Sequence, residues 1–154
     1  MLTLTEVEKA QQLWGEGIVK IAQAYSSGIG YEKLARQHVE SLYAHETSTV
    51  LFKPTLAVNQ QFRTTFEGAV SYFIGGNIDF PEDEGFAIKG WTNVRFENKD
   101  YIFYDNYALA MGNYYFMNQD GNEIKVEFSF GYIVGTDNSL RINLHHSSLP
   151  AIKK

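Results

Sequence analysis

Apolar residues recur every three or four positions along the first 25 residues of the chain. This spacing places them in one stripe on a helix and predicts an amphipathic helix from about residue 5 to residue 25. Thr5 followed by Glu8 predicts a capping box at its start, and the run SSGIG predicts its end. The stripe consists of Val7, Ala10, Trp14, Ile18, Ile21 and Tyr25.

A second helix is predicted from residue 31 to residue 43, with Leu34, Ala35, His38 and Leu42 on one face. We interpret His38 as a hydrogen-bonded core residue rather than a ligand. The period then changes in TSTVLFKPTLA, which is β-branched and alternating and predicts a strand with Pro54 at a sheet edge or at the strand end.

The segments between this strand and residue 86 are short. QFRTTFEG (61–68) predicts a second short strand, and EGAVSYFIGG (67–76) predicts a short helix that ends at its two glycines. NIDFPEDEGF (77–86) is acidic and rich in turn residues. The sequence leaves open whether this loop is a solvated connection or a functional flap.

Long alternating runs fill the rest of the chain and predict four antiparallel strands at 86–97, 101–117, 122–135 and 139–149. Asp120-Gly121 predicts a type I′ hairpin turn, and GTDNS predicts a second turn. Helices followed by a strand meander predict an α+β fold with a curved sheet over the helices. We expect one domain spanning residues 1–154, with a ligand cavity between the sheet and the long helix.

Composition narrows the classes of partner. The net charge of −5 and the pI near 5.3 argue against a nucleic-acid or anionic-membrane partner. The absence of cysteine excludes disulfides and thiolate chemistry. No apolar run reaches the roughly 18 residues of a membrane span, and no signal peptide is visible. We therefore expect a cytoplasmic location, or an organellar or periplasmic one if the chain is an excised domain.

The stretch RINLHHSSLP (141–150) concentrates the candidate chemistry. In a regular strand, Arg141, Asn143, His145 and Ser147 would share one face, and Ile142, Leu144 and His146 would share the other. His145 and His146 would then point apart and could not bind one ion, and a zinc site needs three or four ligands.

His38 and His45, about two helical turns apart, make no simple metal pair either. Ser147 and Ser148 lie in no nucleophile elbow. His145 and Ser147 could line a polar pocket, or their face could be solvent-exposed with Ile142 and Leu144 in the core. The pattern alone favours the exposed face.

Several segments together resemble a known family. FEG before a short helix, the late hairpins and the terminal HHSSLP resemble the NTF2-like superfamily, in the branch related to the calmodulin-dependent kinase II association domain. The segments FKPTLA, FEGAVSYFIGG, GFAIKGWTNVRFEN, ALAMGNYYF, DGNEIKVEFSFGYI and LRINLHHSSLP are more similar still to iota-class carbonic anhydrases.

The resemblance implies a cone formed by helices packed on a strongly bent antiparallel sheet, paired sheet-to-sheet as a homodimer. It implies reversible hydration of carbon dioxide to bicarbonate. Members with manganese or zinc and members without a metal are both known, and the small number of ligands in this chain favours the metal-free type.

The resemblance also places Thr55, Tyr72, His145 and Ser147 at the bicarbonate site. Histidine is the side chain whose pKa suits a general base near neutral pH. We therefore expect His145, directly or through Tyr72 or Ser147, to activate the attacking water. The hydroxyls of Thr55, Tyr72 and Ser147 would hold the bicarbonate oxygens.

Arg141 and Arg63 are further candidates as anion-attracting residues at the pocket. Two other functions stay open. One is a non-enzymatic association module that binds a small carboxylate. The other is an NTF2-like isomerase or cyclase with a buried Asp, which the placement of Asp100, Asp105 and Asp137 in or beside predicted turns disfavours.

Overall fold

A bent five-stranded sheet packs against three helices. The computed structural model describes residues 1–154. The helices are α1 (Leu4–Ser27), α2 (Tyr31–Leu42) and α3 (Phe66–Ile74), with a 3-10 turn η1 (Phe86–Ile88). The strands are β1 (Leu51–Lys53), β2 (Asn93–Phe103), β3 (Tyr107–Met117), β4 (Glu123–Val134) and β5 (Leu140–Ser148). This arrangement confirms the predicted α+β class.

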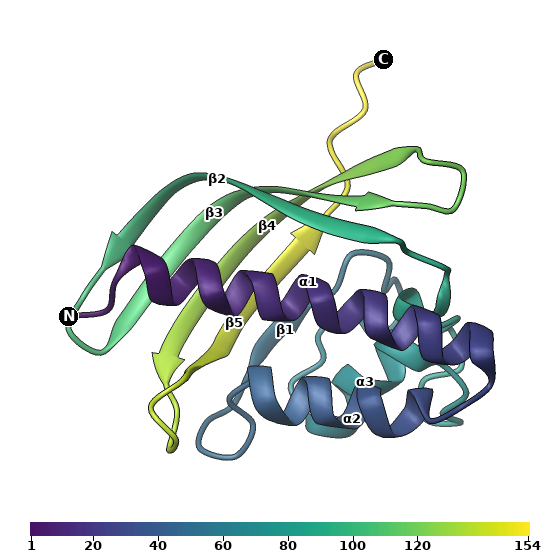
Figure 1. Ribbon diagram of the computed structural model, residues 1–154, viewed down its shortest axis with the longest axis horizontal. Helices are drawn as coiled ribbons and strands as arrows, with labels where there is room; N and C mark the ends of the chain where they lie inside the picture. Colours follow the sequence, from purple (N-terminus) through teal and green to yellow (C-terminus); the bar gives the residue numbers. More distant parts are fainter.

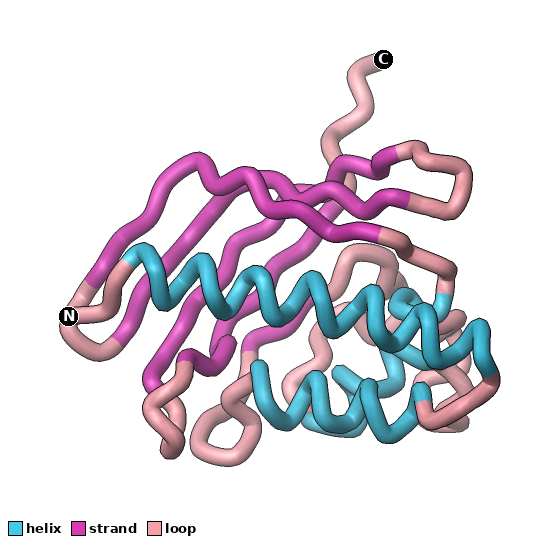
Figure 2. Tube along the Cα trace, in the orientation of Figure 1, coloured by secondary structure: helices cyan, strands magenta, loops and turns pink.

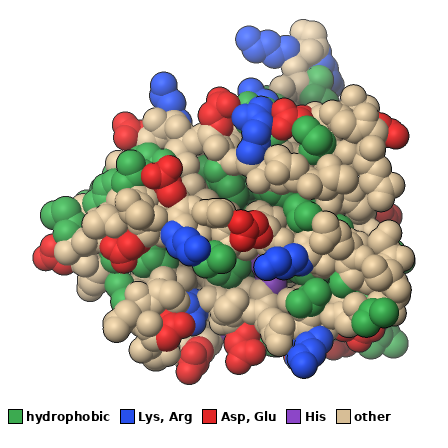
Figure 3. Space-filling model, in the orientation of Figure 1, with side chains coloured by type: hydrophobic (Ala, Val, Ile, Leu, Met, Phe, Trp, Pro, Cys, Tyr) green, Lys and Arg blue, Asp and Glu red, His purple; other side chains and the backbone are tan.

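The strand order is β1-β5-β4-β3-β2, with β1 parallel to β5 and every other pair antiparallel. The long helix α1 crosses the curved sheet, and α2 and α3 lie beside it near β1 and β5 (Figure 1). Figure 2 shows the same division, with the strands curling over the helices. On the face drawn in Figure 3, acidic and basic side chains are interspersed and neither forms a patch. None of the helices combines the length and apolar character needed to cross a membrane.

The helix predictions hold with one correction at the first cap. The N-cap of α1 is Thr3, whose side chain accepts from the Glu6 N–H while the Glu6 side chain accepts from the Thr3 N–H. The capping box predicted at Thr5 and Glu8 is therefore wrong by two residues. Thr5 lies inside the first turn, because the helix starts at Leu4.

Three strand predictions are wrong. Residues 61–68 form no strand, although the Arg63 N–H donates to the Phe52 carbonyl at 2.7 Å. Residues 86–97 begin with the 3-10 turn and become a strand only at Asn93. The run 101–117 is interrupted by a hairpin in which the Tyr104 N–H donates to the Tyr107 carbonyl at 2.9 Å. Aromatic residues on both sides of Asp105-Asn106 hide that turn in the sequence.

Both later hairpins differ from a type I′ turn, which needs two residues with positive φ. At residues 118–122 only Gly121 has one, at 82°, and at residues 135–139 only Asn138 does, at 67°. In each turn a backbone N–H donates to the carbonyl three residues earlier, from Gly121 to Asn118 and from Asn138 to Gly135. Each is thus a type I turn followed by one left-handed residue.

An irregularity in β5 decides which side chains face the core. Ile142 pairs with Tyr132 and Leu144 pairs with Gly131, so Asn143 is an extra residue without a partner of its own. Such a bulge shifts the alternation by one residue. Ile142 and His145, predicted on opposite faces, are consequently both 2% exposed in the core. The exposed face predicted for His145 and Ser147 is wrong as well, since Ser147 is 1% exposed.

Candidate active site

Five buried side chains form an unbroken hydrogen-bond chain beneath α1. Trp14 Nε1 donates to Tyr43 Oη at 3.0 Å, and Tyr43 Oη lies 2.8 Å from His145 Nδ1. The other ring nitrogen, His145 Nε2, lies 3.0 Å from Tyr114 Oη. Tyr114 Oη lies 2.5 Å from Ser147 Oγ. The chain therefore runs through the histidine ring from one tyrosine to another.

The chain ends at a small cavity. Ser147 Oγ lies 2.6 Å from Thr55 Oγ1, and the nearby Tyr72 Oη accepts from the Leu56 N–H at 3.1 Å. The cavity measures about 10 Å³, close to the space that one water molecule needs. Its lining residues are Trp14, Phe52, Pro54, Thr55, Tyr72, Phe86, Tyr114, His145 and Ser147.

The sheet topology brings these residues together. The parallel pairing of β1 with β5 sets Phe52 opposite His145, and Thr55, two residues beyond the end of β1, then reaches Ser147. Tyr43 ends α2 and forms a bridge to Ile142 at the start of the bulge. Four of the predicted site residues therefore surround one cavity: Thr55, Tyr72, His145 and Ser147.

Aromatic rings enclose the imidazole of His145. The Phe52 ring stacks on it with a centroid distance of 4.7 Å, and the Phe130 ring lies 4.1 Å away on a nearly parallel plane. This burial holds the pKa of His145 well below its usual 6.5, with smaller contributions from His146 and His38. The ring is therefore neutral at pH 7, unlike the base titrating near neutral pH that the sequence led us to expect.

Burial acts in the opposite direction on the tyrosines. It raises the pKa of Tyr43, Tyr72 and Tyr114, because each would have to carry a negative charge in an apolar surrounding. All hydroxyls of the site thus keep their protons at neutral pH. The histidine and the tyrosines of the site are therefore neutral hydrogen-bond donors and acceptors at pH 7.

A second hollow of about 250 Å³ adjoins the cavity and shares Tyr72 and Phe86 with it. The rings of these two residues stack at 5.8 Å and separate the two spaces. Glu82, Glu84 and Lys89 lie along the outer hollow. The hollow and the cavity therefore meet at this pair of rings.

Neither predicted arginine belongs to the cluster. Arg63 is fully buried and binds Asp83 through two contacts of 2.7 Å, and it also donates to the Gly68 carbonyl. This pair anchors the acidic loop 77–86. Arg141 pairs with Asp137 at 3.0 Å in the turn before β5, on the other side of the bulge from His145.

Three residues of the hydrogen-bond chain were not predicted from the sequence: Trp14, Tyr43 and Tyr114. Tyr114 lies on β3 in phase with the buried Ala110 and Phe116, so its pattern matches an ordinary core residue. Trp14 likewise belongs to the apolar stripe of α1. No spacing signal connects them to residues 145–147, because their proximity arises only when helix and sheet pack.

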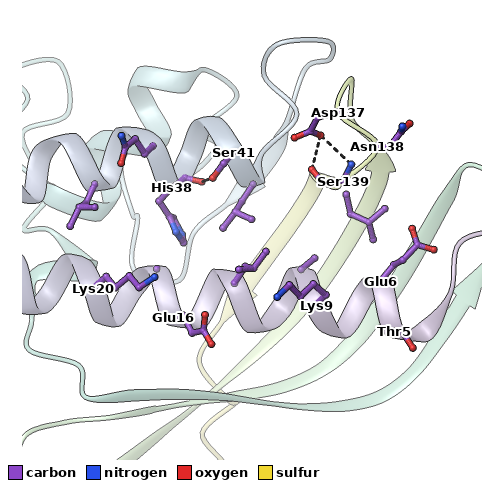
Figure 4. A pocket seen from close by; sticks show the side chains of 17 residues that line it. Thr5, Glu6, Lys9, Glu16, Lys20, His38, Ser41, Asp137, Asn138 and Ser139 are labelled. Carbon is purple, nitrogen blue, oxygen red and sulfur yellow. Dashed lines mark hydrogen bonds between the residues drawn. The ribbon is translucent and has the colours of Figure 1, made fainter.

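A larger hollow, of about 540 Å³, lies elsewhere, between α1, α2 and the turn before β5, and shares no residue with the small cavity. Figure 4 shows Lys9, Glu16 and Lys20 along α1 at its rim and His38 reaching in from α2. His38 is 5% exposed, and its Nε2 has no hydrogen-bond partner. It is a core residue as predicted, but it is not hydrogen-bonded there.

Comparison with known proteins identifies the family. The model of a family described as metal-independent carbonic anhydrase matches residues 5–149. The chain belongs to this family. No three His, Asp or Glu side chains converge in a way that could hold a metal ion.

Individual relatives agree with the family match. A metal-independent carbonic anhydrase from Nostoc sp. is 38% identical over 152 residues, which cover 97% of this chain and 74% of the relative. The crystal structure of an iota-carbonic anhydrase from a cyanobacterium, complexed with bicarbonate, is 37% identical. It matches with a TM-score of 0.96 over 99% of this chain and 94% of that one.

More distant structures show the fold alone. A protein from Xanthomonas campestris described as a calcium/calmodulin-dependent kinase II association domain matches with a TM-score of 0.61 at 18% identity, over 97% of this chain and 89% of that one. An NTF2-like protein from Streptomyces avermitilis matches with a TM-score of 0.60 at 10% identity, over 97% of this chain and 96% of that one. The expected NTF2-like cone and the resemblance to iota-class carbonic anhydrases are both confirmed.

Proposed function

We propose that this metal-independent carbonic anhydrase hydrates carbon dioxide reversibly to bicarbonate at the hydroxyls of Ser147, Thr55 and Tyr72, where the small cavity, with room for the attacking water, meets the adjoining hollow of about 250 Å³. The observation that carries the assignment of these residues is the hydrogen-bond chain, which ends in hydroxyl groups inside an aromatic cavity. Carbon dioxide is apolar and suits walls made of Phe52 and Phe86. Bicarbonate, which the cyanobacterial relative binds, needs hydrogen-bond donors for its oxygens.

The hydroxyls supply a proton relay. A hydroxyl can donate and accept at once, so Thr55 can give its proton to an oxygen of carbon dioxide while taking one from the attacking water. The water oxygen forms the new bond to carbon, and one C=O electron pair moves to the oxygen that receives the proton. The neutral acid formed in this way releases its proton to solvent and becomes bicarbonate.

Within this scheme His145 holds the hydroxyl of Tyr114, which holds Ser147, and Ser147 in turn orients Thr55. Preorganised dipoles of this kind stabilise developing charge without reorganising during the reaction. Tyr72, on the other wall of the cavity, is placed to donate its proton to a second oxygen of the product.

The test is stopped-flow measurement of carbon dioxide hydration after dialysis against EDTA. The chelated protein should keep its activity, and Ser147→Ala should lose about a hundredfold or more, the usual scale of one preorganised hydrogen-bond group. Ser148→Ala is the matched control, because Ser148 is the next residue of β5 and points to the opposite face. Loss of activity on chelation, restored by manganese or zinc, would contradict the metal-free assignment.

The proposal includes a homodimer formed through the outer face of the sheet. No helix packs on this face (Figure 2), where Met111 is 60% exposed and Leu109 and Leu144 are half-buried. Apolar side chains left uncovered on a sheet face are a common feature of interaction surfaces. Light scattering on the eluting protein should give twice the mass of one chain, and Met111→Glu should give a single chain. A single-chain mass for the unmodified protein would contradict the dimer.

A further inference from the structure

The hydrogen-bond chain of the site begins at a group that can only donate. Trp14 is 2% exposed, and its Nε1 lies 3.0 Å from Tyr43 Oη. Indole nitrogen carries a proton and has no acceptor capacity, so the proton in this bond belongs to Trp14. Tyr43 must therefore place its own hydroxyl proton on its other partner, which is His145 Nδ1 at 2.8 Å.

This placement decides the tautomer of His145. A buried hydroxyl proton without an acceptor is costly, so Nδ1 accepts from Tyr43. A neutral imidazole has one donor and one acceptor nitrogen, and the single ring proton therefore lies on Nε2. The opposite tautomer would bring two donors to the Tyr43 oxygen and leave the Tyr43 proton without a partner.

The direction then passes along the rest of the chain. Nε2–H donates to the Tyr114 oxygen, so the Tyr114 proton goes to Ser147 Oγ at 2.5 Å. The Ser147 proton goes to Thr55 Oγ1 at 2.6 Å. Each hydroxyl thus points its proton toward the cavity, and the Thr55 proton is left for the bound molecule.

We propose that Trp14 is a positioning residue that fixes the direction of this chain, so that His145 rests as the Nε2–H tautomer and Thr55 presents a donor to the substrate. A donor at this position favours an oxygen that is gaining negative charge, as both carbon dioxide under attack and bicarbonate provide. The inference rests on the proposed function for the identity of the bound molecule. The tautomer itself is a property of the resting protein.

The direct test is NMR of the protein labelled with ¹⁵N-histidine, at pH 7 and without substrate. The His145 resonances are assigned as those missing from a His145→Gln spectrum. We expect the Nδ1 shift of an unprotonated nitrogen and the Nε2 shift of a protonated one. A protonated Nδ1 would overturn the proposal. A protein with this tautomer but without hydration activity would instead overturn the proposed function.

Trp14→Phe removes the fixed donor. Both tautomers should then populate, so the two His145 nitrogen shifts move toward each other, and the KM for bicarbonate should rise about fivefold, the usual effect of weakening one hydrogen bond. Trp91→Phe is the control, because Trp91 is also buried and its Nε1 donates to the Phe86 carbonyl at 2.8 Å, outside the hydrogen-bond chain. It should leave the His145 shifts unchanged.

If Trp14→Phe does not fold, Tyr43→Phe answers the same question. It keeps the indole ring and removes the hydroxyl that transmits the direction, and it should also populate both tautomers. Unchanged His145 shifts in a folded Trp14→Phe or Tyr43→Phe protein would overturn the proposal.

Discussion

Tyr114→Phe cuts the hydrogen-bond chain in the middle while keeping the aromatic ring. The lost hydroxyl joins His145 Nε2 at 3.0 Å to Ser147 Oγ at 2.5 Å. Ser147 keeps Thr55 as a partner, whereas His145 Nε2 loses the only partner that it has. The variant therefore separates the two ends of the chain without changing the shape of the core.

The cost in stability follows from that one unpaired nitrogen. Leaving a buried polar group unsatisfied costs about 1–3 kcal/mol. For a chain of this size about 1 kcal/mol corresponds to a shift of about 2–4 °C in Tm, so the Tm should fall by roughly 2–12 °C. The protein should stay folded at 25 °C, because typical domains are stable by about 5–15 kcal/mol.

The cost in activity should be larger. With Ser147 held by Thr55 alone and no longer by Tyr114, hydration should slow by about a hundredfold or more, the usual scale of losing one preorganised hydrogen-bond donor. The assay is stopped-flow hydration at 25 °C, beside a thermal melt of the same sample. Tyr132→Phe is the control, because Tyr132 is 1% exposed on the neighbouring strand and lies outside the chain. A folded Tyr114→Phe protein with the activity of the control would refute the role of the chain.

Three further predictions concern pH and packing. The hydration rate should stay constant from about pH 6.5 to 9, because the pKa of His145 is held below this range and those of the site tyrosines above it; a midpoint near 7 would contradict a neutral relay. Below pH 6.5 the free energy of unfolding should fall by about 1.4 kcal/mol per pH unit for each buried histidine, because His38 (pKa about 3) and His145 stay neutral in the folded protein and bind protons in the unfolded one. Urea midpoints at pH 7, 6 and 5 measure this loss. Gly17→Ala should destabilise the fold by about 1–3 kcal/mol, because the new Cβ would lie 2.1 Å from His38 Nδ1. A melting curve measures this cost beside that of Gly28→Ala, whose Cβ meets no atom within 4 Å, so that its cost comes from the positive φ of 73° alone.

Local periodicity was sufficient to predict the helices and the last two strands. The stripe on α1 and the alternation of β4 are strong because one face of each element is buried over most of its length. One error, the single strand predicted over residues 101–117, occurs because aromatic residues continue across the turn at Asp105-Asn106. A turn of two polar residues inside such a run leaves too little signal to divide it.

The site was predicted only in part, and the reason is the bulge at Asn143. A single extra residue brings Ile142 and His145 to the same face, which strict alternation excludes. His145 and Ser147, which the family resemblance put at a bicarbonate site, both line the cavity, whereas the pattern alone put them in solvent. The same assumption of strict alternation placed Arg141, which precedes the bulge, on the face of His145, whereas the bulge puts the two residues on opposite faces.

The neutral character of the site limits the chemistry that it can perform. A metal ion activates water by supplying positive charge, and a titrating histidine does so by accepting a proton. Here the pKa of His145 is far too low for it to accept a proton at pH 7, and both of its nitrogens are already bonded to tyrosines. What remains is a row of oriented dipoles in an apolar pocket, where each hydrogen bond is stronger than in water. In the proposed mechanism, catalysis therefore depends on the direction of the protons along the hydrogen-bond chain, and that direction begins at Trp14.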